Sequence, residues 1–350
     1  MKLEEIINQI HPLDQAAMQS AQARQNVLTK PQGSMGRLEE LSIQLAGIQR
    51  KPLPAIKDKV IVTMAGDHGV VAEGVSAFPQ EVTPQMVMNF LMGGAAINVL
   101  ARHIGARVVI VDMGVASDFE PHPSLIVKKV AKGTANMAKG PAMTRAQAEQ
   151  AILAGVEVVE AEIKRGLDIV GTGDMGIGNT TPSAAIATAL TGESPAKIAG
   201  RGTGVDDEGL KRKVSAVERA LAVNQPNPKD GLDVLAKVGG FEIGGLAGVI
   251  LGAAANGKPV MVDGFISTAA AMIAVAVAPA VRPYLISAHR SKEVGHGIML
   301  DWLQLKPLFD LDMRLGEGTG AALGMSMAEA ACKVLAEMAT FGEAGVSDKE

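Results

Sequence analysis

Aromatic side chains, cysteine and surplus basic charge are all scarce in this sequence of 350 residues. Aromatic residues make up 3% of the chain, and Cys332 is the single cysteine. One cysteine excludes an internal disulfide bond and cannot alone form a structural zinc site. In its Ala-rich helical setting we expect Cys332 to be a small buried hydrophobe. Acidic residues number 37 against 33 basic ones, a formal charge of −4. With so few rings for base stacking, this balance argues against a nucleic-acid partner.

The sequence also lacks a long, strongly apolar run. Residues 1–15 are acidic and amphipathic, unlike the apolar core of a signal peptide. The most hydrophobic stretch, 265–281, is mostly Ala and Val and includes Ser267, Thr268 and Pro279. A spanning helix needs about 20 strongly apolar residues. We therefore expect a buried core helix here, no membrane span, and a cytoplasmic protein.

Short β-rich runs alternate with helical patterns from residue 58 onward. The runs are 59–64, 107–111, 167–170, 259–262 and 284–286, with 197–199 as a shorter candidate, and helical patterns such as 144–165 and 207–223 separate them. Runs that are apolar on both faces predict a mainly parallel sheet covered by helices on both sides, an α/β fold. Glycine provides 40 residues, above the roughly 7% that is typical, and we expect it mainly in the connecting loops.

Polar residues follow the predicted strands, at the edge where open α/β sheets bind ligands. The strand ends carry Asp67 and His68, then Asp112, then the run GTGDMGIGNTTP at 171–182, then Asp263, and finally SAHRS at 287–291. A short polar side chain after a strand can also simply cap the next helix. That alternative stays open for each end taken singly.

Two glycine-rich segments suggest a phosphate site. Residues 171–176 match G-x-G-x-x-G, but the acidic residue of a dinucleotide site is missing, because Glu193 lies in a loop rather than at a strand end. Glycines can still bring backbone N–H groups and a helix N-terminus close to a phosphate. The second segment, 200–204, precedes Lys211, Arg212 and Lys213. The alternative is a pair of glycine turns and a solvated basic helix face.

Two other patterns exclude further classes of site. Residues 252–258 have Walker A spacing, but Pro259 replaces the Ser or Thr that would hold Mg²⁺, so we interpret Gly257 as a turn after a helix. His68, His289 and His296 share no metal-ligand spacing. We expect neither a metal site nor a cofactor. Glu317, flanked by glycines, fits a ligand loop or merely the first turn of a helix.

Several segments, taken in order, resemble one enzyme family. They are PQGSMGRLEELS, MAGDHGVVAEGVSAFPQEVT, GGAAINVLAR, GTGDMGIGNTTP, GRGTGVDDEGL, VGGFEIGGLAG, VDGFISTAAA, SAHRS and LDMRLGEGTGAALG. Together they are similar to the nicotinate-nucleotide–dimethylbenzimidazole phosphoribosyltransferases, nearly end to end. The resemblance implies transfer of the phosphoribosyl group from nicotinate mononucleotide to 5,6-dimethylbenzimidazole, in the assembly of the cobalamin nucleotide loop.

The resemblance also implies an architecture. We expect a Rossmann-like six-stranded sheet in a large domain, 51–324, and a small helical domain formed by both termini, 1–50 plus about 325–350. A homodimer is the usual assembly of the family.

The resemblance assigns roles to particular residues. It makes Glu317 the general base. Asp174, where relatives commonly have Glu, would have at most an auxiliary role, because the side chain of aspartate is shorter than that of glutamate. We predict that Gly176, Gly202, Gly204 and Lys213 hold the phosphate. The segment 76–85 would help form the base pocket. The other expected substrate-binding residues are Phe78, Gln85, Asn179, Thr180, Asp263, Ser291 and Leu315.

Two other function classes stay open at this point, a nicotinamide-dependent dehydrogenase and a non-catalytic nucleotide-binding protein. The missing ribose-binding acid argues against the first. The second predicts nucleotide binding without release of nicotinate. Which benzimidazole, purine or phenolic acceptor is preferred is not determined by the sequence.

Overall fold

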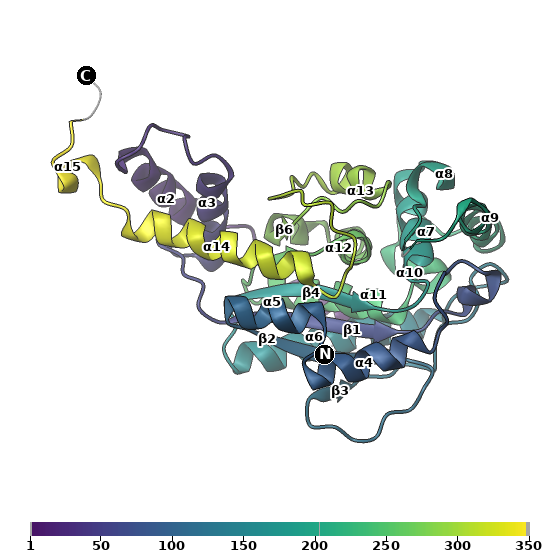
Figure 1. Cartoon of the computed structure of the whole chain (residues 1–350). Helices are drawn as coiled ribbons and strands as arrows, with labels where there is room; N and C mark the ends of the chain where they lie inside the picture. Colours follow the sequence, from purple (N-terminus) through teal and green to yellow (C-terminus); the bar gives the residue numbers. More distant parts are fainter. Residues whose placement is uncertain (1, 203, 348–350) are drawn as a thin grey trace.

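The computed structural model describes residues 2–202 and 204–347, and its centre is one parallel sheet (Figure 1). The six strands are β1 Lys59–Gly66, β2 Ala106–Gly114, β3 Leu125–Val127, β4 Ile169–Met175, β5 Val260–Val262 and β6 Leu285–Ser287. Their order is β3-β2-β1-β4-β5-β6, and every neighbouring pair is parallel. This order reverses direction between β1 and β4, as in Rossmann folds, so the expected fold class is confirmed.

Three details of the predicted strands were wrong. Residues 197–199 form no strand, because Ser194 and Pro195 begin the short helix α8 Pro195–Ile198 there. The edge strand β3 was missed, since three residues carry too little pattern to recognise. The third run, predicted at 167–170, continues to Met175, so much of the glycine segment is strand rather than loop.

Alternate strand residues belong to two different hydrophobic layers. Val60, Val62 and Met64 pack in one cluster with α11 Phe241–Ala255 and α12 Phe265–Val277, and α6 Arg145–Lys164 lies against α11. Ile61 and Ala65 pack in the other cluster. Helices α3 Arg37–Gln49, α4 Val82–Met92, α5 Ala96–Ile104 and α14 Thr319–Glu337 supply that second cluster. Both faces of the sheet are therefore covered, as the apolar runs predicted.

The remaining elements surround these layers. They are α1 Leu3–Ile7, α2 Gln15–Val27, the 3₁₀ helix η1 Gly69–Glu73, α7 Thr180–Thr191, α9 Asp207–Asn224, α10 Gly231–Val238, the 3₁₀ helix η2 Pro279–Tyr284, α13 His296–Leu303 and α15 Phe341–Ala344. Cys332 is buried, as predicted, and 265–277 is a buried helix, also as predicted. Within the described ranges, we find no helix with the length and apolar character needed to cross a bilayer.

Helices α2 and α3, from the N-terminal part of the chain, pack with the second half of α14 beyond one end of the sheet (Figure 1). The Arg24 side chain donates to the backbone oxygens of Leu335, Ala336 and Met338 at 2.6–3.3 Å. Helix α1 instead packs on α11, and α14 runs through residue 325 without a break. The division into 1–50 plus 325–350 and 51–324 stays a prediction, and its terminal residues 1 and 348–350 lie outside the described part.

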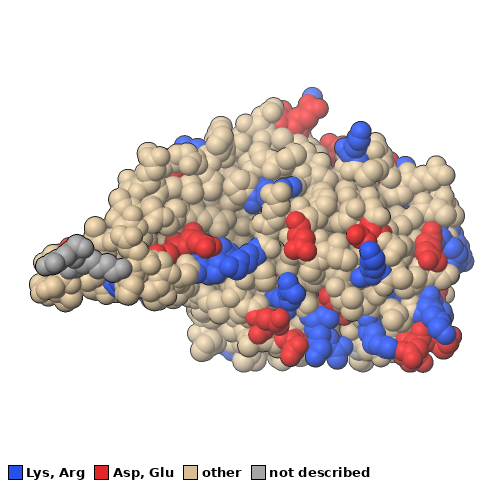
Figure 2. Space-filling model, turned by 90° about the horizontal axis from the view of Figure 1, so that it is seen from above, with Lys and Arg blue, Asp and Glu red and all other residues tan. Residues whose placement is uncertain are grey.

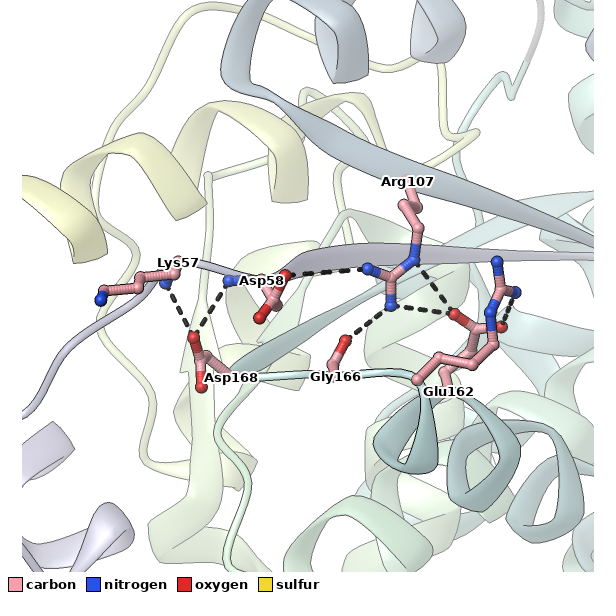
Figure 3. Close-up of polar contacts among 7 residues, drawn as sticks. Lys57, Asp58, Arg107, Glu162, Gly166 and Asp168 are labelled. Atoms are coloured by element: carbon pink, nitrogen blue, oxygen red, sulfur yellow. Dashed lines mark hydrogen bonds and ion pairs between the residues drawn. The ribbon is translucent and has the colours of Figure 1, made fainter.

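The amino ends of the strands are joined by a polar network (Figure 3). Arg107 of β2 donates to the carboxylate of Glu162 on α6 at 3.1 Å and to the carbonyl of Gly166 at 2.6 Å. The Asp168 carboxylate accepts from the backbone N–H groups of Lys57 and Asp58 at 2.8 and 3.0 Å. These contacts tie β1, β2, β4 and α6 together at the end opposite the cavity described below.

Most glycines lie in turns and loops, as expected from composition, but several lie where two helices pack against each other. A Cβ on Gly155 of α6 would lie 1.8 Å from the carbonyl oxygen of Gly245 on α11. A Cβ on Gly248 of α11 would lie 1.9 Å from the carbonyl oxygen of Ile152 on α6. The two backbones approach so closely that no side chain fits between them. Glycine is required here by helix packing.

We expect Gly155→Ala to lower the free energy of unfolding by about 1–3 kcal/mol, because the added methyl group forces the two helix backbones apart. Urea denaturation measures this change. Gly297→Ala, in α13 with nothing within 4 Å of the new Cβ, is the matched control and should be neutral or slightly stabilising. Unchanged stability of Gly155→Ala would contradict the close packing.

Candidate active site

A cavity lies at the carboxyl ends of the strands, beside the point where the strand order reverses. It encloses about 760 Å³, part of it open to solvent. Predicted site residues that line it are Asp174, Gly176, Asn179, Thr180, Gly202, Lys213, Ser291 and Leu315. The lining also includes residues that were given no predicted binding role, namely Arg201, Phe265, His289, Glu293 and Arg314. Four separate connections in the sequence thus meet in one place, as the strand-end rule predicts.

One end of the cavity holds a buried cation. Lys213 of α9 is 1% exposed, and its Nζ donates to Thr180 Oγ1 at 2.9 Å and to the carbonyl oxygen of Gly200 at 3.1 Å. Gly202 has φ of +54°, and a Cβ there would lie 2.9 Å from Lys213 Nζ. Glycine is therefore favoured both by the backbone conformation and by the lack of space for a side chain. Burial lowers the pKa of Lys213 to about 8, although the negative charge of Glu293 acts to raise it. Beside the N-terminus of α7, this is a site for an anion.

The charges on the rest of the surface do little to attract an anion to this site. Figure 2 shows Lys and Arg side chains intermixed with Asp and Glu side chains across the face seen there. The net charge of −4 does not attract an anion either. Capture of a phosphate would therefore depend on Lys213 and the nearby backbone dipoles.

Glu317 sits in a strained loop between the cavity and the sheet. Its φ is +64°, and Gly316 and Gly318 on either side are also positive, at +86° and +97°. Such a conformation costs a non-glycine residue about 1 kcal/mol or more, which is typical of functional loops. The Glu317 N–H donates to the Asp174 carbonyl at 3.2 Å, and its carbonyl accepts from Thr63 Oγ1 at 2.9 Å. Both contacts fix the loop on the ends of β4 and β1.

Glu317 is buried, with 5% of its surface exposed. Its Oε2 accepts from the backbone N–H of Ile97, at the N-terminus of α5, at 3.1 Å. Burial raises the pKa of Glu317, the bond from Ile97 opposes that rise, and Asp263 adds to it. A carboxylate with a raised pKa is a stronger base, which suits proton abstraction. Glu317 itself is outside the cavity lining, whereas Gly316 and Leu315 before it are part of it.

Asp263, expected to bind substrate, lies beneath this loop. Its Oδ2 accepts from the Gly318 N–H at 3.2 Å and its Oδ1 from the Ala321 N–H at 2.9 Å. The residue is fully buried and absent from the cavity lining. Burial raises the pKa of Asp263, while His289 and the loop amides oppose the rise. The structure therefore gives Asp263 the position of a cap on α14 that holds the Glu317 loop.

Asp174, at the end of β4, does line the cavity. Its Oδ2 accepts from Asn179 Nδ2 at 3.0 Å, and its Oδ1 has no partner among the described residues. Burial raises the pKa of Asp174 well above its ordinary value, and the neighbouring carboxylates Asp263, Glu242 and Glu317 raise it further. The neutral acid is therefore favoured more strongly here than at an exposed aspartate.

His296 joins two cavity loops through a chain of hydrogen bonds. Its Nδ1 accepts from the Ser291 N–H at 2.8 Å, so Nε2 carries the proton and donates to Thr268 Oγ1 at 2.9 Å. Thr268 Oγ1 in turn donates to the Gly264 carbonyl at 2.7 Å. Burial lowers the pKa of His296 to about 3, so it remains neutral. No pattern in the sequence indicates this role.

The carboxylates of the first two strand ends bind backbone N–H groups of residues 114–116 rather than capping a helix. The Asp112 carboxylate accepts from the N–H groups of Gly114 and Val115 at 3.0 and 2.9 Å. The Asp67 carboxylate accepts from the Ala116 N–H at 2.8 Å. His68 is buried against Glu242, with 2.8 Å between Nε2 and Oε1. In the described ranges, no three His, Cys, Asp or Glu side chains form a group suited to a metal ion.

Besides Glu317 and Asp263, three other predicted residues lie outside the cavity lining. Phe78 is 48% exposed, and Gln85 lines a separate groove with Met88 and Phe119. A Cβ added to Gly204 would meet no atom of the described residues within 4 Å. Thr203, between Gly202 and Gly204, is outside the described residues. A role for Phe78, Gln85 and Gly204 in binding stays a prediction.

Comparison with known proteins decides the family. A phosphoribosyltransferase family model matches residues 10–346. The nicotinate-nucleotide–dimethylbenzimidazole phosphoribosyltransferase of Roseiflexus sp. is 62% identical over 347 residues, 99% of this chain and 98% of that one. Its counterpart from Geobacter sulfurreducens is 57% identical over 346 residues, 99% and 98% of the two chains. The chain belongs to the nicotinate-nucleotide–dimethylbenzimidazole phosphoribosyltransferase family.

The fold of this phosphoribosyltransferase also matches solved structures. The nicotinate-nucleotide–dimethylbenzimidazole phosphoribosyltransferase of Thermus thermophilus superimposes with a TM-score of 0.92 at 47% identity, covering 96% of this chain and 100% of that one. A structure described as CobT from the same organism gives 0.93 at 49% identity, covering 95% and 100%.

We expect binding of ribose 5-phosphate to this phosphoribosyltransferase to weaken about 10-fold between pH 7 and pH 9. Because the pKa of Lys213 is about 8, its positive charge is present below that pH and is lost above it. Calorimetric titration at several pH values measures the effect. Lys213→Arg should abolish the pH dependence, since arginine stays charged, and Lys211→Gln should preserve it. Affinity independent of pH in the unmodified protein would contradict the assignment.

Proposed function

We propose that this enzyme transfers the 5-phosphoribosyl group of nicotinate mononucleotide to 5,6-dimethylbenzimidazole. The products are α-ribazole 5′-phosphate and nicotinate, for assembly of the cobalamin nucleotide loop. The names of relatives at about 60% identity along the whole chain support this substrate pair. The structural observation that carries it is the loop 314–318. Its first residues line the cavity that contains Lys213, and it ends on the buried carboxylate of Glu317.

The reaction needs one bond exchange and one proton transfer. The bond from ribose C1′ to the pyridinium nitrogen breaks, and nicotinate leaves with the electron pair. One benzimidazole nitrogen forms the new bond to C1′, and the N–H proton of the other nitrogen passes to Glu317. C1′ has oxocarbenium character between these events, so a nearby carboxylate also stabilises its positive charge. The cationic leaving group is already activated without a metal-bound pyrophosphate.

Lys213 and the loops around it would hold the donor phosphate. Thr180, Gly202 and the N-terminus of α7 add uncharged donors beside the ammonium group. This remote contact supplies binding energy for holding C1′ and the acceptor nitrogen in line. Gly176 and Asn179 line the same cavity, and Asn179 also bonds Asp174. Asp174 would act as an auxiliary group, as a largely neutral acid.

The acceptor base would lie against the segment 76–85 and the loop 314–316. Ser76, Met175 and Leu315 line this side of the cavity, and Leu315 is 58% exposed. Aliphatic and backbone surface would therefore contact the flat base, with Phe78 nearby.

We also propose a homodimer in the cytoplasm. Exposed Met88 and Met92 on α4, at 44% and 75%, are apolar surface that a second copy could cover.

We expect Glu317→Gln to lower kcat by about 10²–10⁴-fold, because glutamine keeps the bond from Ile97 but cannot take the proton. Nicotinate release with both substrates measures the rate. In the unmodified enzyme, activity should fall as the pH drops through the raised pKa of Glu317, and the variant should lack this acidic limb. Glu337→Gln, at the exposed end of α14, is the control. Near-normal turnover of Glu317→Gln would contradict the assignment of Glu317 as the general base.

The substrate pair itself is tested with the unmodified enzyme and a panel of acceptor bases. We expect release of nicotinate and formation of α-ribazole 5′-phosphate with dimethylbenzimidazole. A protein that binds nicotinate mononucleotide but releases no nicotinate with any acceptor would refute the proposed function. Tight binding of NAD instead would favour the dehydrogenase alternative.

A further inference from the structure

A second carboxylate faces the cavity near the phosphate end, and the transfer chemistry leaves it without a role. Glu293 follows β6, is 8% exposed and lines the cavity. Its backbone N–H donates to Ser291 Oγ at 3.4 Å, and its backbone oxygen accepts from the His296 N–H at 3.0 Å. Oε2 of its side chain has no hydrogen-bond partner among the described residues. A buried oxygen of this kind is costly unless a ligand or water donates to it.

Gly200 shows that space is kept for this carboxylate. A Cβ on Gly200 would lie 2.1 Å from Glu293 Oε2, so any other residue would displace the side chain. The carbonyl oxygen of the same Gly200 accepts from Lys213 Nζ at 3.1 Å. Glu293 and the cation therefore lie on two sides of one residue. Within the described ranges they form no ion pair, so Lys213 leaves Oε2 available.

The chemistry of the donor decides what Oε2 can bind. A phosphate and a nicotinate carboxylate are anions that accept hydrogen bonds, so both repel a carboxylate. The pyridinium ring has no N–H. At neutral pH the hydrogen-bond donors of nicotinate mononucleotide are its ribose 2′- and 3′-hydroxyl groups. The benzimidazole N–H is already assigned to Glu317.

We propose that Glu293 accepts a hydrogen bond from a ribose hydroxyl group of the donor and so selects a ribose over a deoxyribose. This inference rests on the proposed function for the identity of the donor. With the phosphate on Lys213 and a hydroxyl on Glu293, the sugar is held at two points. C1′ then has a fixed direction in the cavity, which in-line transfer requires.

The test compares ligands that differ by one hydroxyl group, without acceptor base, so that no turnover occurs. The probes are nicotinate mononucleotide, its 2′-deoxy and 3′-deoxy forms, ribose 5-phosphate, 2-deoxyribose 5-phosphate and inorganic phosphate. We expect the unmodified enzyme to bind the full nucleotide about 10-fold or more tightly than one of its deoxy forms. Glu293→Gln should lose most of this preference and bind inorganic phosphate as before.

Two further variants keep the result interpretable. Gly200→Ala should reproduce the loss of sugar preference, because its Cβ displaces the carboxylate. Lys213→Gln should weaken every phosphate-bearing probe, inorganic phosphate included, and retain the preference. Equal weakening of all probes in Glu293→Gln would show that Glu293 only balances the charge of Lys213, and would overturn the proposal. So would an unmodified enzyme that does not distinguish ribose from deoxyribose.

The two proposals fail in different ways. Discrimination between the sugar phosphates without nicotinate release would refute the proposed reaction and leave the role of Glu293 standing. Normal nicotinate release with no discrimination between the sugar phosphates would refute the role of Glu293 and leave the proposed reaction standing.

Discussion

The buried carboxylate of Asp263 is the contact on which the geometry of the site depends. It follows β5 in the sheet, and it accepts from the N–H groups of Gly318 and Ala321 at the start of α14. A cap at a helix N-terminus is stabilising by itself. Here the same two bonds also fix the loop whose strained centre is Glu317. The position of the Glu317 carboxylate, the proposed base, is thus set by the sheet rather than by the mobility of a surface loop.

Concentrated negative charge is the cost of this arrangement. Asp174, Asp263, Glu242 and Glu317 are all buried at one edge of the sheet. His68 lies 2.8 Å from Glu242, and His289 lies 3.9 Å from Asp263. Burial raises the pKa of Asp174, Asp263 and Glu317, so full ionisation of the group is disfavoured. Neighbouring carboxylates with separated pKa values are what acid and base roles require. The stronger rise at Asp174 fits its proposed auxiliary role as a neutral acid, and Glu317 is the proposed proton acceptor.

Local patterns in the sequence predicted the layers of the fold and the position of the candidate site. They were less able to predict contacts between residues that are far apart in the sequence. The apolar runs and the strand-end rule brought Asp174, Gly176 and Lys213 to one edge of a parallel sheet. The three-residue edge strand β3 carried too weak a pattern. Glu293 and His296 could not be assigned, since their partners Gly200 and Thr268 are far away in the sequence. The glycines between α6 and α11 could not be assigned to helix packing, because no local pattern shows that these two helices touch through their backbones.

The glycine segment of β4 shows how packing can imitate a binding motif. A Cβ on Gly173 would lie 2.2 Å from the carbonyl oxygen of Glu317, and one on Gly176 would lie 2.3 Å from that of Gly66. Gly173 therefore lets the Glu317 loop lie against β4, and Gly176 lets the ends of β1 and β4 meet. A dinucleotide fingerprint uses glycine to bring backbone towards a pyrophosphate. This chain uses the same spacing to bring backbone towards backbone. The proposed phosphate site consequently lies elsewhere, at Gly202 and Lys213, where a buried cation would bind the anion instead of a fingerprint loop.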